Sequence, residues 1–208
     1  MKNLIIVDNP FVKRDVTILR DSDTQPADFR SALSRVSYAL AIEIGKTLDL
    51  LEYEVSTPLE KTKGYKLKKQ IVLVPVLRAG LSMVSSFLEM IPDAKVGHIG
   101  LQRDEKTLEP IDYYYKTPNN LDESVTILLD PMLATGGSAV ASFNYLRKRD
   151  AGKCILACLI AAPEGVNKMS SDHPEVPIYT AALDRQLSNI GYILPGLGDA
   201  GDRTFGTF

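Results

Sequence analysis

The stretch from Val125 to Ser138, VTILLDPMLATGGS, constrains the fold more than any other part of the chain. Its first residues are apolar or β-branched without polar alternation, which is typical of a strand buried on both faces of a parallel sheet. Asp130 follows at the carboxyl end of this strand, and Pro131 predicts that the strand ends there because proline cannot donate to a ladder. Gly136 and Gly137 allow a tight loop, and apolar residues at helical spacing follow. The sequence therefore predicts a strand, an acid, a small-residue loop and a helix N-terminus, in that order.

This loop is suited to an anion. Backbone N–H groups, the hydroxyls of Thr135 and Ser138 and the positive end of a helix dipole would meet at one point, which favours a phosphate dianion. An ordinary βα loop, whose glycines serve only the turn, is an equally open interpretation. The loop is not a Walker A, because no lysine follows the glycines, and it is not a G-x-G-x-x-G fingerprint.

Two further apolar runs lead into arginines. Ile71–Leu77 predicts a second buried strand that runs into Arg78, and residues 94–101 predict a third strand with Arg103 close to its end. Open parallel sheets bind ligands at the carboxyl ends of their strands, so these guanidinium groups are expected beside the 130–138 loop, where they would suit a diphosphate. An arginine after a strand is, on its own, more often an ion-pair partner.

The remaining pattern completes an α/β fold: an open, mostly parallel twisted sheet flanked by helices. Apolar residues at spacings of three and four after Pro26 predict a long amphipathic helix for core or dimer packing. Residues 153–162 and 176–181 predict two more strands, and the lysine-rich segment 53–69 a strand or hairpin on a solvated face. A single domain is expected, because 208 residues at 45% hydrophobic content are too few for two comfortable cores.

Composition excludes several classes of function. A net charge of −2 argues against a broad nucleic-acid surface, and no apolar run approaches membrane-spanning length or a signal-peptide core. Cys154 and Cys158 would lie about 13 Å apart on a strand, too far for a disulfide, so they are expected to be reduced core residues of a cytoplasmic protein. His98 and His173 lie in no ligand-spaced cluster, so neither a zinc site nor a Ser-His-Asp triad is expected.

Four segments together resemble the type I phosphoribosyltransferase family, in the form of its uracil branch. They are PVLRAGLSM at 75–83, GLQRDEKTLEP at 100–110, LLDPMLATGGS at 128–138 and GYILPGLGDAGDRTFGT at 191–207. Many members of the wider family have two adjacent acids where this chain has Asp130-Pro131. That departure is similar to the uracil branch, but it removes one possible metal or ribose ligand.

The resemblance implies an enzyme that transfers the 5-phosphoribosyl group from 5-phospho-α-D-ribose 1-diphosphate (PRPP) to N1 of uracil, giving UMP and diphosphate. The implied catalytic residues are Arg78, Arg103, Asp130 and Asp199. The implied PRPP-binding residues are Arg78, Arg103, Asp130, Pro131, Met132, Leu133, Ala134, Thr135, Gly136, Gly137, Ser138 and Asp199. The implied uracil-binding residues are Ile193, Gly198, Asp199 and Ala200.

Within these sets each group of the substrates has an expected partner. The 5′-phosphate is assigned to residues 134–138, the ribose hydroxyls to Asp130, and the diphosphate to Arg78 and Arg103. Three roles stay open for Asp199: it could orient the base, contact the metal shell or take the N1 proton. Mg²⁺ is the implied cofactor, and it would be held mainly by PRPP and water, with no protein side chain assigned to it.

The resemblance also divides the single domain into functional segments. Residues 1–25 are expected to form an N-terminal arm, 102–117 a flexible hairpin that covers the site, and 191–208 a base-binding tail. The tyrosines at 113–115 are equally compatible with an oligomer contact or a cross-strand ladder. A homodimer or higher oligomer is expected. Some members of the family respond to GTP, and no feature of this sequence decides whether GTP is an effector here.

The tail suggests how the base would be recognised. It contains five of the fourteen glycines, which suits a main chain that approaches a ligand closely. A backbone series of N–H, C=O and N–H can match the edge of uracil, whereas the amino group of cytosine would leave groups unpaired. A regulator that binds RNA or nucleotide without turnover stays an alternative, although no basic face is evident. A Rossmann dehydrogenase would need the absent dinucleotide fingerprint.

Overall fold

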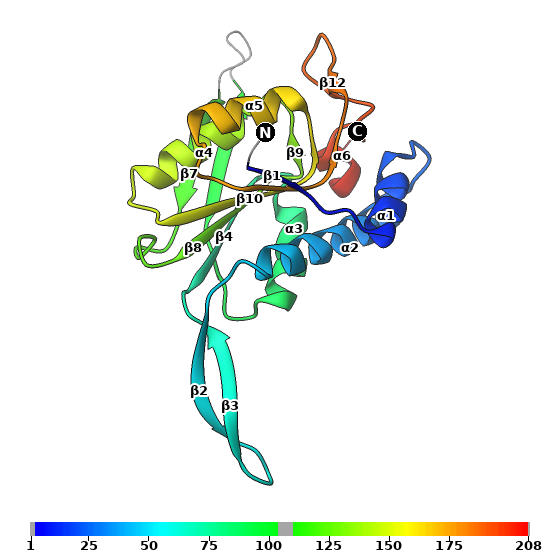
Figure 1. Cartoon of the computed structure of the whole chain (residues 1–208). Helices are drawn as coiled ribbons and strands as arrows, with labels where there is room; N and C mark the ends of the chain where they lie inside the picture. Colours follow the sequence, from blue (N-terminus) through cyan, green and yellow to red (C-terminus); the bar gives the residue numbers. More distant parts are fainter. Residues whose placement is uncertain (1–2, 104–109, 208) are drawn as a thin grey trace.

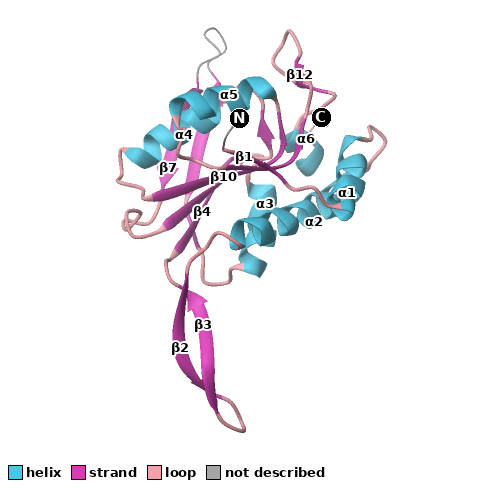
Figure 2. Ribbon diagram, viewed as in Figure 1, coloured by secondary structure: helices cyan, strands magenta, loops and turns pink. Residues whose placement is uncertain are grey.

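The computed structural model describes residues 3–103 and 110–207, except for the side chains of residues 101–113. In this part of the chain, a nine-stranded sheet carries helices on both faces (Figures 1 and 2). Its strands, in spatial order, are β1 (Leu4–Ile6), β11 (Ile178–Leu183), β10 (Lys153–Ala161), β8 (Val125–Leu129), β4 (Ile71–Leu77), β6 (His98–Arg103) and β7 (Pro110–Lys116), and the short strands β5 (Lys95–Val96) and β9 (Met132–Leu133) pair with β4 and β10. The pairs along this order are parallel up to β6, and β7 is antiparallel to it. The expected fold class is confirmed.

Helices cover the two faces of the sheet and enclose two cores. α4 (Gly137–Arg147) and α5 (Pro163–Asp172) lie on one face, and α1 (Pro10–Arg20), α2 (Pro26–Gly45) and α3 (Leu81–Met90) lie on the other (Figure 1). Val72 and Leu128 pack in the core under α4, whereas their neighbours Leu73 and Ile127 pack in the core under α2. This alternation explains why β4 and β8 are apolar at successive positions. Each large side chain buried in this way contributes about 1.5–3 kcal/mol.

The predicted elements with strong periodicity are confirmed. β8 and β4 have the predicted bounds, and α2 begins at Pro26. The apolar stripe of α2 is buried in the core of the chain, which settles its role as core packing: Phe29, Leu33, Val36, Leu40 and Ile44.

The predictions for two strands were wrong in their bounds. β11 begins at Ile178 and not at residue 176, because Pro177 cannot donate to the ladder and its carbonyl instead accepts from Leu156. The strand predicted over 94–101 is divided at Gly97 into β5 and β6. A side chain at Gly97 would meet Thr117 Cγ2 at 2.7 Å. β6 continues to Arg103 because it pairs with β7 as a hairpin.

This β6–β7 hairpin corresponds to the segment expected to cover the site. Residues 104–109 and the side chains of 101–113 lie outside the described part, so the covering role stays a prediction. The ring of Tyr115 packs on α4, with its centroid 5.0 Å from that of Tyr145. Tyr115 therefore contacts the body of its own chain, which neither interpretation of the tyrosine run foresaw.

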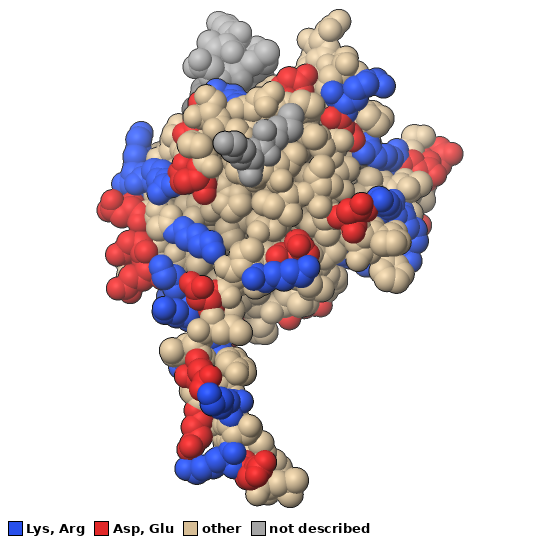
Figure 3. Space-filling model, in the orientation of Figure 1, with Lys and Arg blue, Asp and Glu red and all other residues tan. Residues whose placement is uncertain are grey.

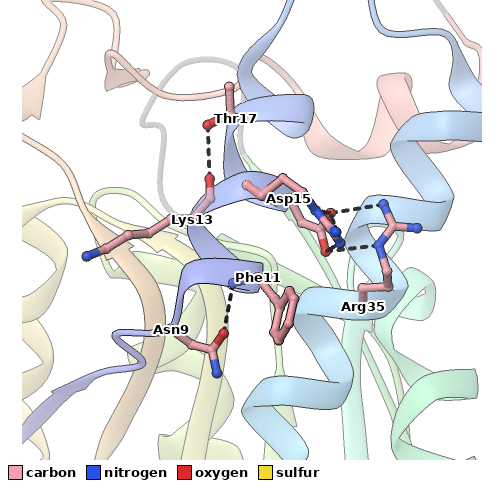
Figure 4. A network of polar contacts seen from close by, with 7 residues as sticks. Asn9, Phe11, Lys13, Asp15, Thr17 and Arg35 are labelled. Carbon is pink, nitrogen blue, oxygen red and sulfur yellow. Dashed lines mark hydrogen bonds and ion pairs between the residues drawn. The ribbon is translucent and has the colours of Figure 1, made fainter.

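The N-terminal segment contains a helix that sequence patterning missed. α1 begins after Asn9, whose side chain accepts a hydrogen bond from the N–H of Phe11 at 2.8 Å. Asp15 is buried and accepts hydrogen bonds from Arg14 and, at 2.9 and 3.0 Å, from Arg35 of α2 (Figure 4). The hydrogen bond to Asp15 is the main cause that raises the pKa of Arg35. The arm is therefore fixed to the domain.

A second hairpin projects away from the body (Figure 1). It consists of β2 (Leu50–Ser56) and β3 (Lys61–Leu67), and it confirms the hairpin expected in the lysine-rich segment. The lysines of β3 face acids of β2, and Lys61 and Lys63 form ion pairs across the hairpin with Glu54 and Glu52. Figure 3 shows both signs of charge interspersed over the visible face of the molecule.

The C-terminal tail returns to the carboxyl ends of the central strands. β12 (Gln186–Leu187) and β13 (Ile193–Leu194) pair antiparallel, and the short helix α6 (Ala200–Phe205) follows. Ile193, Leu197 and Ala200 are buried in the core that α2 covers, which anchors the tail. Among the described helices, none is long and apolar enough to cross a membrane.

Candidate active site

A cavity of about 350 Å³ lies between the tips of β4 and β8 and the C-terminal tail. From the strand side it is lined by Val76, Leu77, Arg78, Ala79, Asp130, Met132, Ala134 and Ser138. From the tail it is lined by Ile190, Gly191, Tyr192, Ile193, Gly198, Asp199, Ala200 and Gly201. Polar groups from both sides therefore face one space, which is the arrangement that the sequence predicted.

The loop after β4 is held tightly against β8. Gly80 donates its N–H to the carbonyl of Val76 at 2.8 Å, which closes a turn around Arg78. A Cβ atom at Gly80 would lie 2.2 Å from the carbonyl oxygen of Leu129, so only glycine allows this approach. The peptide bond between Leu77 and Arg78 is cis. This loop places Arg78 beside the end of β8.

The guanidinium of Arg78 bridges the strand tips and the tail. Its Nη2 lies 3.1 Å from Asp202 Oδ1, and its Nη1 donates to Thr207 Oγ1 at 3.4 Å. The Thr207 hydroxyl also donates to Asp202 at 2.6 Å, and this hydrogen bond, followed by Arg78, lowers the pKa of the Asp202 carboxyl. More than half of the Arg78 side chain is exposed, so a ligand can reach its charge.

The loop after β8 has the form expected of an anion site. Asp130 Oδ1 accepts from the N–H of Met132 at 3.3 Å. Helix α4 begins at Gly137, one of the two glycines expected to form the loop. Gly136 has a φ of 81°, a conformation that glycine adopts readily. A Cβ atom at Gly165 of α5 would lie 2.4 Å from the carbonyl oxygen of Ala134, so the two backbones pack directly together. The N-terminus of α4 thus faces the cavity from a rigid loop.

The C-terminal tail lines the cavity largely with glycines and other residues that bring its main chain close to the cavity. Gly191, Gly196 and Gly198 all have positive φ values, a backbone conformation that favours glycine. Asp199 caps α6, because its Oδ1 accepts from the N–H of Asp202 at 2.9 Å. This capping role was not among those considered from the sequence.

The profile of the protein family described as uracil phosphoribosyltransferase matches residues 6–207. The chain belongs to the uracil phosphoribosyltransferase family. It is 48% identical over 207 residues to a uracil phosphoribosyltransferase of Acholeplasma laidlawii, and the match covers 100% of both chains. A solved structure of a protein from Aquifex aeolicus is similar with a TM-score of 0.93 and 37% identity, over 98% of each chain. An adenine phosphoribosyl transferase from Trypanosoma brucei shares the fold, with a TM-score of 0.61 and 12% identity over 92% of this chain and 88% of its own.

The structure brings together most residues that the resemblance to this family had singled out. Nine line the main cavity: Arg78, Asp130, Met132, Ala134, Ser138, Ile193, Gly198, Asp199 and Ala200. Leu133, Thr135 and Gly136 line a smaller hollow of about 30 Å³ that shares Asp130 and Ser138 with it. Pro131 and Gly137 line neither, and the Pro131 carbonyl accepts from Leu159 and Ile160 of β10. Arg103 ends β6, and its side chain lies outside the described residues.

Sequence reasoning missed part of the cavity wall. Neither Ile190 nor Tyr192 was assigned to the site, yet both line the cavity and are 78% and 50% exposed. They flank Gly191, whose φ is 82°. Two large apolar side chains around a glycine, at the start of the 191–207 segment, were the available signal for a cavity rim.

The cavity offers a hard cation such as Mg²⁺ two carboxylates and no complete set of protein ligands among the described residues. Among the described residues there is no group of three or more His, Cys, Asp or Glu side chains that could hold a metal. Two carboxylates of the cavity, Asp130 and Asp199, offer oxygen ligands. Mg²⁺ commonly takes one or two carboxylates together with substrate phosphates and water, so these residues fit the magnesium expected of this family as a substrate-held ion.

Proposed function

We propose that the protein transfers the 5-phosphoribosyl group of PRPP to N1 of uracil and releases UMP and diphosphate. The observation that carries this proposal is the single cavity in which Arg78, the N-terminus of α4 and the main chain of the tail face one another. A sugar that carries a phosphate at one end and a diphosphate at the other needs two separate anion sites. A base needs a third surface between them.

Each part of the cavity has a partner in the substrates. The 5′-phosphate binds at residues 134–138, where the loop and the start of α4 supply N–H donors and a positive dipole. Asp130 accepts from the ribose hydroxyls, and Arg78 binds the diphosphate. Arg103 is proposed as a second diphosphate ligand from its sequence position at the end of β6.

The base binds to the tail at Ile193, Gly198, Asp199 and Ala200. A main-chain series of donor, acceptor and donor pairs with uracil, whereas the amino group of cytosine would face a second donor. Buried polar groups that lose their partners give strong discrimination, so cytosine should be a poor substrate.

The chemistry requires stabilisation of a leaving anion. As diphosphate departs, the ribose carbon gains positive charge and the diphosphate oxygens gain negative charge. Arg78 binds those oxygens, and the anchored loop and tail hold sugar and base in line, which replaces a bimolecular encounter by a positioned one. When bound, Mg²⁺ neutralises charge on the diphosphate. Asp199 caps α6 and lines the cavity from the tail, where it orients the base, contacts the metal shell or receives the N1 proton.

The direct test is product formation. The protein would be incubated with labelled uracil, PRPP and Mg²⁺, and UMP would be separated and counted. UMP well above a protein-free blank, with cytosine giving none, is the expected result. Absence of UMP together with binding of nucleotide would favour the regulator and reject the enzyme.

We also propose that the chain self-associates. The β2–β3 hairpin exposes large apolar side chains that a solvated hairpin does not need: Leu50, Leu51, Tyr53, Leu59, Tyr65 and Leu67. The two free, buried cysteines support the cytoplasmic setting that the sequence suggested.

An effector role for GTP, implied by the resemblance alone, is tested by assaying UMP formation with and without GTP.

A further inference from the structure

The C-terminus of α1 meets the base-binding tail through one arginine. Arg20, the last residue of α1, donates to both carboxylate oxygens of Asp184, from Nη1 at 2.8 Å and from Nη2 at 2.5 Å. Its Nη1 also donates to the carbonyl of Gly196 at 2.9 Å. Asp184 directly follows β11 and has only 4% of its side chain exposed. This pair therefore joins the first helix, the sheet and the tail at one buried point.

Both backbone polar groups of Gly196 are bound by this pair. Its N–H donates to Asp184 Oδ2 at 2.8 Å, and its carbonyl accepts from Arg20. Gly196 has a φ of 64°, and a Cβ atom there would lie 2.2 Å from the carbonyl oxygen of Ile193. The turn from Ile193 to Gly196 is thus tight, and Arg20 and Asp184 fix its last residue by hydrogen bonds.

The next residue of the tail is held from the same helix end. Arg203 of α6 is buried, and its Nη1 donates to the carbonyl of Leu197 at 2.8 Å and to that of Leu19. Its Nη2 donates to the carbonyl of Asp21 at 2.5 Å. The chain between the base contacts at Ile193 and Gly198 is therefore fixed to the end of α1 at consecutive residues.

We infer that the Arg20–Asp184 pair is the positioning unit of the base site, which orients the main chain of residues 193–200 and so sets the affinity for uracil. The inference rests on the proposed function. Recognition by main-chain groups depends on the direction of each N–H and C=O, and no rotamer change can compensate for a displaced backbone. Small misplacements in a site of this kind cost large factors in rate or affinity. Neither residue lines the cavity, so the pair acts through the backbone of Gly196.

The chain contains a matched control for this pair. Asp15 is also buried, also receives an arginine fork, and also fixes α1, but to α2 (Figure 4). Neither Asp15 nor Arg35 lines the cavity. A purely structural role for Arg20 would make Arg20→Ala and Arg35→Ala behave alike in kinetics, because both remove a guanidinium from a buried carboxylate that fixes α1 to the rest of the chain.

The experiment compares these two variants with the wild type. In Arg20→Ala we expect KM for uracil to rise about tenfold, as the loss of a charge-assisted hydrogen bond implies, while KM for PRPP changes less than about twofold. In Arg35→Ala we expect a lower melting temperature with both KM values unchanged. Equal shifts of KM for uracil in the two variants, or none in Arg20→Ala, would overturn the inference.

A second variant covers the case in which Arg20→Ala does not fold. Asp184→Asn keeps the shape of the side chain but removes the charge that holds Arg20. We expect it to raise KM for uracil and to accelerate hydrogen exchange at the N–H of Gly196. An unchanged KM and unchanged exchange refute the inference. Failure of the wild type to form UMP would instead reject the proposed function.

Discussion

A side chain would clash with the backbone at Gly80, whereas there is open space for one at Gly45. Replacing Gly80 by alanine places Cβ against backbone atoms of Leu129 and Val76, which cannot yield, so we expect a loss of about 3 kcal/mol in the free energy of unfolding. Gly45 ends α2 with nothing within 4 Å, so Gly45→Ala should stabilise by about 0.5 kcal/mol. Urea denaturation of both variants measures these changes. Equal stability of Gly80→Ala and wild type would contradict the described packing.

The Asp202 carboxyl, which pairs with Arg78, has a lowered pKa that can be measured by titration. Because the Thr207 hydroxyl is the main cause that lowers its pKa, Thr207→Val should raise that pKa toward the usual carboxyl range. A carboxyl with a depressed pKa stabilises the fold above its ordinary pKa, and this contribution is lost as the pH falls through the depressed value. Carbon-13 NMR titration of the Asp202 carboxyl provides the measurement. An unchanged or lower pKa of Asp202 in the variant would show that the Thr207 hydroxyl is not the main cause of its depressed pKa.

The sequence predicts which site residues stand at strand ends but not the contacts that support them. Arg78 and Asp130 could be placed together because parallel strands end at one edge of the sheet. Arg20 and Asp184 are separated by more than 160 positions, and neither stands in a motif. Their pairing depends on how α1 lies on the sheet, which local patterning does not determine.

Strand β10 buries both thiols of the chain. Burial raises the pKa of Cys154 to about 11 and that of Cys158 to about 12, so neither forms the reactive thiolate near neutral pH. We expect no reaction with a colorimetric disulfide reagent at pH 8 in the folded protein, and reaction of both thiols in denaturant. Stoichiometric reaction of either thiol before unfolding would show that β10 is more open than described.

Elements were predictable where their periodicity was strong. β4, β8 and α2 follow directly from apolar runs or stripes. α1 was missed because its buried face includes Asp15, which packs inside only as the partner of Arg14 and Arg35. The division of β5 from β6 at Gly97 was missed because it depends on a neighbouring segment, at Thr117.

The exposed apolar side chains of the β2–β3 hairpin lead to a prediction for the whole molecule. We expect light scattering at micromolar concentration to give at least twice the chain mass of 22.9 kDa. Replacing Leu50 and Tyr65 together by glutamate, both well exposed in the single chain, should lower that mass. A wild-type mass equal to one chain would contradict self-association.

One cavity is proposed to bind the phosphate, the ribose and the base of a nucleotide. A crystal structure with UMP bound is the strongest test of this proposal. The phosphate should bind at residues 134–138 and the uracil edge at the main chain of Ile193 and residues 198–200, with Arg78 left free for diphosphate. A nucleotide bound elsewhere, or a base that makes no contact with the tail, would contradict this mode of binding.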